Sequence, residues 1–268
     1  MSALCKLLNI PRSTFYYERK GQLHDHEAEN AVKRVFESSR GVYGYRKIKA
    51  ALERECMILS RRRICRIMRK FGLVSKYTKA QYKHHITTCN EDQIANQLAR
   101  QFNSQSLLST IVSDLTYVKV KSKWHYICVL VDLFNREIIS YSVGPNKTAD
   151  LVYQAFAGAN IPLDQIGMFH TDRGNEFKNS QIEDMLRAFN IERSLSKKGC
   201  PYDNAVAEST FKIIKVEFVN GKTFDSLDDL KTQFADYVNW FNTIRLHGTL
   251  GYQTPIEYKL NSLTYLSN

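Results

Sequence analysis

Residues 111–120 read IVSDLTYVKV, and this run decides the fold. Apolar and β-branched residues dominate it, which predicts a strand over Ile111–Val120. Strands predicted over Trp124–Asp132 and Glu137–Val143 follow after short turns, so we expect an antiparallel meander. Asp114 stands inside the first strand, although Asp is depleted in strands and costly to bury unpaired. The run therefore predicts a sheet that carries a functional carboxylate.

Helices and short strands alternate further along the chain. We expect helices near Ala149–Ala159 and Ser180–Phe189, strands at Ile166–His170 and Glu192–Leu195, and a long helix near Asp203–Val219. The order βββ-α-β-α-β-α predicts an α/β fold, a mixed five-stranded sheet with flanking helices.

A small all-α region is expected before the sheet. Helices are predicted over Tyr45–Cys56 and Arg61–Phe71, with Ser60 as an N-cap and Gly72 as a C-terminal stop. Residues 2–20 have the pattern of the end of a helix-turn-helix, too short to be a complete domain.

The charge of the chain is concentrated in one stretch. The net charge is +11, and Arg40–Lys83 holds 14 Lys and Arg residues against two acids, a local charge of +12. Such an excess favours a polyanionic partner, and its concentration favours a dedicated nucleic-acid-binding module over a merely basic solvated face. The predicted Arg61–Phe71 helix has the form of a recognition helix. Its cations fall mainly off the apolar stripe: Arg62, Arg63, Arg66, Arg69 and Lys70.

Three acids stand at positions where an acid is costly. Besides Asp114, Asp172 ends a short strand in the run HTDRG, and Glu208 lies on a helix with small Ala neighbours. Carboxylate ligands without Cys or neighbouring His favour Mg²⁺, with Mn²⁺ as a substitute. Two such ions can drive an in-line phosphoryl displacement. Asp114, Asp172 and Glu208 are therefore the predicted catalytic and metal-binding residues.

The spacing of these acids carries a resemblance. Asp114 and Asp172 are 58 positions apart, 35 residues separate Asp172 from Glu208, and Lys215 follows seven positions later. The sequence motifs around the acids carry the same resemblance. They are SDLTY at 113–117, VDLF at 131–134, HTDRG at 170–174, SKKG at 196–199 and YDNA at 202–205, followed by Tyr237, Asn242, Arg245 and His247 with LGY at 250–252 and TP at 254–255. The chain resembles the OrfB transposases of the IS-three insertion-sequence family, whose DDE core is similar to retroviral integrases.

The resemblance implies a ribonuclease-H-like core that performs metal-dependent DNA cleavage and strand transfer during transposition. It also implies a phosphate-binding role for Lys215, double-stranded DNA as partner, a homo-oligomer on DNA and an upstream OrfA partner or fusion. Two alternatives stay open: a nuclease of the same fold without strand transfer, and a non-catalytic DNA-binding protein. A nuclease needs no separate end-binding module, so the basic N-terminal region disfavours it. The presence of all three acids disfavours the non-catalytic DNA-binding protein.

Four segments are expected: a helix-turn-helix DNA-binding region at 1–76, a linker at 77–106 with a helix near Gln93–Arg100, a catalytic core at 107–220, and a C-terminal helical tail at 221–268. The six cysteines form no C-x-x-C pair, so we expect reduced thiols. A cytoplasmic protein is expected, because the sequence shows neither a signal peptide nor an apolar run of membrane-spanning length.

Three polar residues near the acids have simpler expected roles. Asp132 is interpreted as a turn residue at a strand end, and His170 as a packed strand residue rather than a proton carrier. Asp203 or Asn204 is the expected N-cap of the Glu208 helix.

Overall fold

The computed structural model describes Cys5, Leu7, Pro11 and residues 23–78, 106–196 and 205–266. Two compact units divide the chain at Val74 and Ser75. Three predictions lie outside the described residues: nearly all of the helix-turn-helix remnant at 2–20, the helix near Gln93–Arg100, and the N-cap at Asp203 or Asn204.

Over residues 23–74 the first unit contains three helices, α3 (Leu23–Ser38), α4 (Tyr45–Arg54) and α5 (Arg61–Lys70), each of which contacts the other two. Helix α5 begins where Ser60 Oγ accepts the N–H of Arg63 at 3.2 Å. It ends at Gly72, whose φ of +62° lies in the left-handed region that glycine adopts without strain. Both predicted ends of this helix are confirmed.

Helix α3 is an element that the sequence patterns did not reveal. Its buried positions Ala28, Ala31, Val32 and Val35 follow helical spacing. The side chains are small and lie among eight charged or histidine residues, so the apolar stripe is weak in the sequence.

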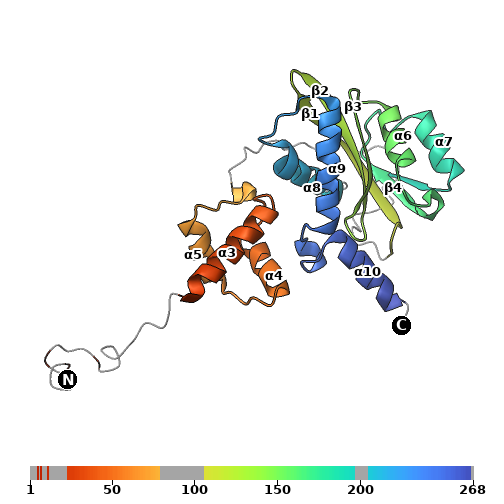
Figure 1. Ribbon diagram of the computed structural model, residues 1–268. Coiled ribbons are helices and arrows are strands. Elements are labelled where there is room, and N and C mark those ends of the chain that lie inside the picture. The colour runs from red at the N-terminus through yellow and green to blue at the C-terminus, as the bar shows by residue number, and fades with distance from the viewer. Residues whose placement is uncertain are drawn as a thin grey trace. The chain divides into compact units, whose positions relative to one another are not determined.

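The second unit is built on one sheet in the order β3-β2-β1-β4-β5 (Figure 1). The strands are β1 (Thr110–Val120), β2 (Lys123–Asp132), β3 (Ile138–Gly144), β4 (Met168–Thr171) and β5 (Glu192–Leu195). The first three are antiparallel neighbours, and β4 and β5 run parallel to β1. This mixed five-stranded sheet confirms the ribonuclease-H-like fold and places β1 at its centre.

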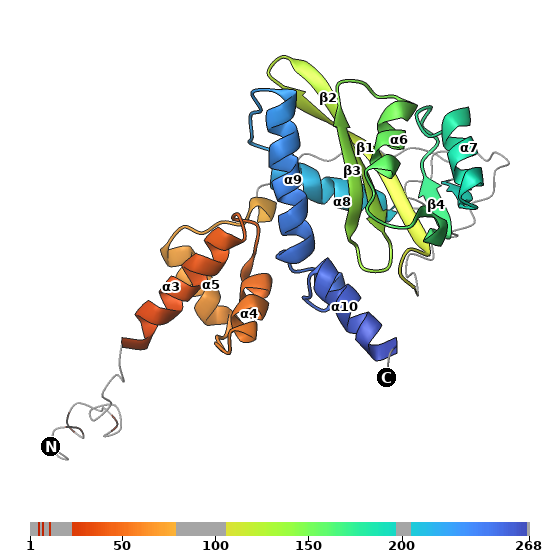
Figure 2. The ribbon, with the colours of Figure 1, turned by 45° about the vertical axis from the view of Figure 1, so that its right-hand side comes forward.

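Helices cover both faces of this sheet. Figures 1 and 2 show α6 (Ala149–Ala157) and α7 (Ser180–Ala188) on one side, and α8 (Ala205–Ile214) and α9 (Leu227–Thr243) on the other. Helix α10 (Pro255–Leu266) packs on α9. On the α6 side Phe169 contacts the rings of Phe156 and Phe177, which are almost completely buried and fix β4 against the helices.

Several predicted boundaries differ from the structure by one or two residues, and two differences bear on the region of the acids. Strand β4 begins at Met168 rather than Ile166, because the Gly167 N–H bonds to the Leu108 carbonyl outside the ladder. The long helix predicted to reach Val219 is α-helical only to Ile214 and continues as the π-helical segment η4 (Lys215–Val219). Wider π turns are rare and often lie near functional sites.

Within the described ranges, no helix combines the length and the apolar character needed to cross a membrane. The four cysteines described, Cys5, Cys56, Cys65 and Cys128, are free thiols.

Candidate active site

Strand register brings the first two predicted acids together. The parallel ladder pairs Thr110 with Met168 and Val112 with His170. Asp114 and Asp172 each follow the last of these pairs by two residues, and the charge of Asp172 raises the pKa of Asp114. Asp172 Oδ1 accepts the Gly174 N–H at 2.9 Å, so a local turn orients this carboxylate as the chain leaves the sheet.

Glu208 comes to the same region from a later part of the chain, helix α8. It lies in the first turn of α8, which packs against β1. Burial and the negative charge of Asp172 raise the pKa of Glu208 above its ordinary value. The residue as a whole stays exposed, so it is open to a ligand.

Asp114 is the most perturbed acid of the three. Burial raises its pKa from 3.8 to about 7, against the effect of the Leu115 N–H, which donates to its Oδ1 at 2.7 Å. Asp172 and Glu208 raise this pKa further through charge repulsion, and Lys215 lowers it. Strong perturbation by burial and specific neighbours marks a candidate functional site.

The three acids are electrostatic neighbours rather than a closed cluster. In the part of the chain that the structure describes, no group of three His, Cys, Asp or Glu side chains lies close enough to hold a metal ion. Convergence of the three on a metal stays a prediction.

Lys215 is held beside Asp114 at the start of η4. Its Nζ lies 4.9 Å from the centre of the Tyr117 ring, and its charge lowers the pKa of Asp114. The resemblance alone pointed to this residue, and the structure places it next to the first acid.

A second cation at the site has no signal in the sequence. Lys147, in the loop between β3 and α6, forms an ion pair of 2.9 Å with the buried carboxylate of Glu176. The bond to Glu176 raises the pKa of Lys147, and the charges of Asp172 and Asp114 raise it further. No local pattern reveals this pair, because its members lie 29 positions apart.

A buried ion pair anchors the helix that carries Lys215. Glu217 and Arg245 are almost completely buried, and Arg245 Nη2 donates to Glu217 Oε1 at 2.7 Å. The hydroxyls of Tyr77 and Tyr237 donate to the same carboxylate at 2.6 and 3.1 Å. Because a buried charge needs both a partner and further hydrogen bonds, Glu217 holds η4 in a single place.

Asn242, also in the predicted C-terminal tail, joins a helix to the sheet. Asn242 on α9 exchanges two hydrogen bonds with the backbone of Ile138, at 3.0 and 2.9 Å. This pair fixes α9 to strand β3. The residues of the C-terminal part that carry the family resemblance therefore support the helices around the acids rather than the acids themselves.

The simpler roles predicted for two polar residues agree with the structure. Asp132 is buried, and its two carboxylate oxygens accept the N–H groups of Leu108 and Phe134, each at 2.9 Å. His170 is completely buried, with Nδ1 2.8 Å from Ser194 Oγ. Both residues organise the strand ends behind the site.

In the first unit, the predicted DNA-binding cations differ in exposure. Arg62, Arg66 and Arg69 are exposed on α5, whereas Arg63 is half-buried at the capped N-terminus. Lys70 is exposed but forms an ion pair of 2.6 Å with Glu29 of α3. Together with Arg61, which is also exposed, these three arginines make up most of the cationic surface that α5 offers to solvent.

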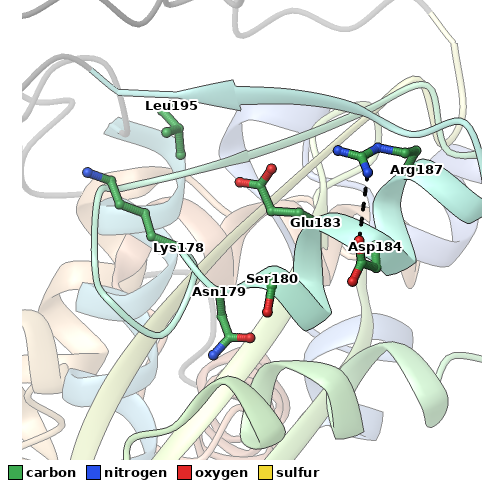
Figure 3. A pocket seen from close by; sticks show the side chains of 7 residues that line it. All are labelled: Lys178, Asn179, Ser180, Glu183, Asp184, Arg187 and Leu195. Atoms are coloured by element: carbon green, nitrogen blue, oxygen red, sulfur yellow. Dashed lines mark ion pairs between the residues drawn. The ribbon is translucent and has the colours of Figure 1, made fainter.

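A separate cavity of about 430 Å³ lies at the N-terminal end of α7 (Figure 3). Its lining is Lys178, Asn179, Ser180, Glu183, Asp184, Arg187 and Leu195. None of the three acids contributes to it, and an Asp184–Arg187 ion pair of 3.8 Å lies on its wall. We assign it no part in the chemistry, which the acids locate elsewhere.

Known families match almost the whole described chain. Residues 23–81 match an HTH-like domain, and residues 107–201 and 208–263 match the integrase core domain. The chain is 30% identical over 266 residues to InsK of insertion sequence element IS150 from Escherichia coli (strain K12), covering 97% of this chain and 93% of the relative.

A second relative is the transposase InsF for insertion sequence IS3A of the same organism, 27% identical over 98% of this chain and 95% of the relative. Among solved structures, the catalytic core domain of HTLV-2 integrase in complex with magnesium is 18% identical. The alignment covers 56% of this chain and 95% of that one, with a TM-score of 0.43.

The raised pKa of Asp114 predicts a pH-dependent stability. Between pH 3.8 and about 7 the folded state keeps a proton that the unfolded state has released, so stability falls as pH rises through this window. Asp114→Asn removes this contribution. With divalent metal chelated, we expect the variant to gain stability over the wild type as pH rises to about 7, and no further gain above it.

Chemical unfolding of both proteins at several pH values measures this difference. Asp164→Asn, at an exposed acid, is the control and should show no such trend. A stability difference for Asp114→Asn that does not change with pH would contradict the burial of this carboxyl.

Proposed function

Because this chain belongs to the OrfB transposases of the IS-three insertion-sequence family, we propose that Asp114, Asp172 and Glu208 are the catalytic, metal-binding acids of its DNA cleavage and strand transfer. The family acts in transposition and DNA integration through an integrase core domain, with DNA as substrate and a divalent metal as cofactor. The finer proposal concerns which residues do this, and with which ions.

The pKa of Asp114 is the observation that carries the proposal. Two further acids raise it, so negative charge is crowded where solvent compensates it poorly. A divalent cation with a preference for oxygen ligands relieves that repulsion, and the donor set fits Mg²⁺, with Mn²⁺ as a substitute. We propose two ions, shared among the three acids.

When bound, such a pair of ions supplies activation of the attacking oxygen and stabilisation of the leaving oxygen. The chain itself supplies the remaining requirements. The β1–β4 register fixes Asp114 and Asp172, and α8 presents Glu208. Lys215 offers a cation for a phosphate of the bound DNA.

Removing the charge of any one acid tests the assignment. We expect Asp114→Asn, Asp172→Asn and Glu208→Gln each to reduce cleavage and strand transfer below detection, because a ligand charge is lost with little change in volume. The measurement uses labelled DNA carrying the element ends, with Mg²⁺ and with Mn²⁺.

The matched controls are Asp164→Asn and Glu192→Gln, at exposed acids that do not contribute to the raised pKa values of Asp114 and Glu208. They should retain wild-type rates. Near-normal turnover in any of the three site variants would remove that acid from the assignment. Cleavage without strand transfer in the wild type would favour the simple nuclease.

We also propose that the cationic side of α5 contacts DNA phosphates. Each phosphate neutralised contributes about −0.9 to the slope of log K against log salt on duplex DNA. Arg62→Ala combined with Arg66→Ala should therefore flatten that slope by up to about two and weaken binding. Filter binding or fluorescence anisotropy over a salt series measures it.

Arg187→Ala combined with Lys231→Ala removes the same charge from α7 and α9, where both residues pair with acids three positions away. This control should leave the slope unchanged. Equal slopes for the two double variants would show that α5 does not contact DNA phosphates and is a structural helix with a solvated basic side.

Assembly is the remaining proposal: a homo-oligomer on paired DNA ends, with an upstream OrfA partner or fusion. Joining two ends requires that both be held together, and a linked second binding module makes that encounter effectively intramolecular. We expect a fusion of this chain to the product of the upstream frame to join ends faster than this chain alone. Equal rates from the lone chain as a monomer on a single end would contradict this assembly.

A further inference from the structure

The β1–β2 hairpin carries an exposed aromatic pair that the proposed chemistry does not use. Tyr117 and Trp124 are 56% and 53% exposed. Their ring centres lie 5.1 Å apart with the ring planes at 89°. A single exposed aromatic residue is ordinary, but two contacting rings that each leave half of their surface open form a defined apolar patch.

The charged side chains of the hairpin that carries this pair all have one sign. The hairpin from Tyr117 to Trp124 contains Lys119, Lys121 and Lys123, each exposed, and no acid. Lys119 pairs with Trp124 in the strand register, and lies two residues from Tyr117 on the same face of β1. The patch therefore consists of two aromatic rings interleaved with lysines. Such a surface fits a ligand that carries flat apolar groups on an anionic backbone.

The patch adjoins the acids. Lys215, which is close enough to lower the pKa of Asp114, has its Nζ 4.9 Å from the centre of the Tyr117 ring. Tyr117 and Asp114 are three residues apart on β1, so their side chains leave opposite faces of the strand, and Lys215 is the group that lies near both. A DNA strand whose phosphodiester lies at the acids can therefore reach these rings past Lys215.

We propose that Tyr117 and Trp124 form a stacking surface for an unpaired base of the DNA strand that enters the active site, with Lys119, Lys121 and Lys123 holding its neighbouring phosphates. In a duplex, the faces of the bases are covered by their neighbours, so only an unstacked base can use the rings. The inference rests on the proposed function, because that function supplies the DNA strand. It adds a requirement that the end of the DNA be locally opened.

Tryptophan fluorescence provides a direct test. The chain has two tryptophans, and Trp240 is 3% exposed, so a quencher in solution reaches mainly Trp124. The probe is a short single-stranded oligothymidylate, added to the full-length protein in the presence of a chelator so that no catalysis occurs. We expect it to quench the emission, whereas the same length of base-free deoxyribose phosphate should bind without quenching.

The variants separate stacking from charge. Stacking of one base on an aromatic side chain contributes about 1–3 kcal/mol, so Trp124→Ala should weaken binding of the oligothymidylate by roughly 5- to 150-fold, and Trp124→Phe should restore most of it. On the base-free strand Trp124→Ala should have no effect. Lys119→Ala with Lys123→Ala should instead weaken both strands and reduce the salt dependence, by about 0.7 for each phosphate that is no longer neutralised.

Three results would overturn the proposal: equal quenching by the base-free strand, an equal loss of affinity for both strands in Trp124→Ala, or equal quenching by a fully paired duplex. Circular dichroism checks that each variant is folded. The binding test needs neither metal nor turnover, so its result is separate from that of the strand-transfer assay. Quenching without strand transfer would leave the stacking surface in place and reject the proposed function.

Discussion

The burial of Asp114 beside two other carboxylates is the constraint on which the rest of this structure depends. Asp114 lies at the centre of the sheet with little water, and Asp172 and Glu208 add negative charge beside it. Such an arrangement destabilises the folded state unless rigid elements impose it. The position of β1 between β2 and β4 provides that rigidity, since both neighbours fix its register.

Two lysines near the acids reduce the electrostatic repulsion between the carboxylates. Lys215 approaches Asp114 from η4, and Lys147 approaches Asp172 from the loop after β3. Each cation is itself held by another interaction, Lys147 by buried Glu176 and Lys215 by its place next to the Glu217–Arg245 pair. Cations that are fixed beside the acids, but not bonded to them, reduce the repulsion and leave the carboxylate oxygens available to metal ions.

This arrangement also explains why the C-terminal part belongs to the core. Arg245 and Tyr237 from the region of α9 satisfy the buried carboxylate of Glu217, and Asn242 fastens α9 to β3. These hydrogen bonds hold η4, which carries Lys215, although all three residues lie far from the acids in sequence. The resemblance identified them as part of a motif, and the hydrogen bonds give the physical reason for their presence.

The sequence by itself determined the order of strands and helices in the core and the ends of α5, and it singled out three acids whose catalytic role stays a prediction. These features depend on local patterns: alternation, capping residues, and acids placed where they are costly. It did not reveal α3, whose buried side chains are small, nor the π-helical segment η4, in which Glu217 bonds to a buried partner 28 positions away. Only the tertiary structure decided which charges meet. The Lys147–Glu176 pair, the closeness of Lys215 to Asp114 and the contact of Tyr117 with Trp124 arise from strand register and helix packing, and a linear pattern does not contain those distances.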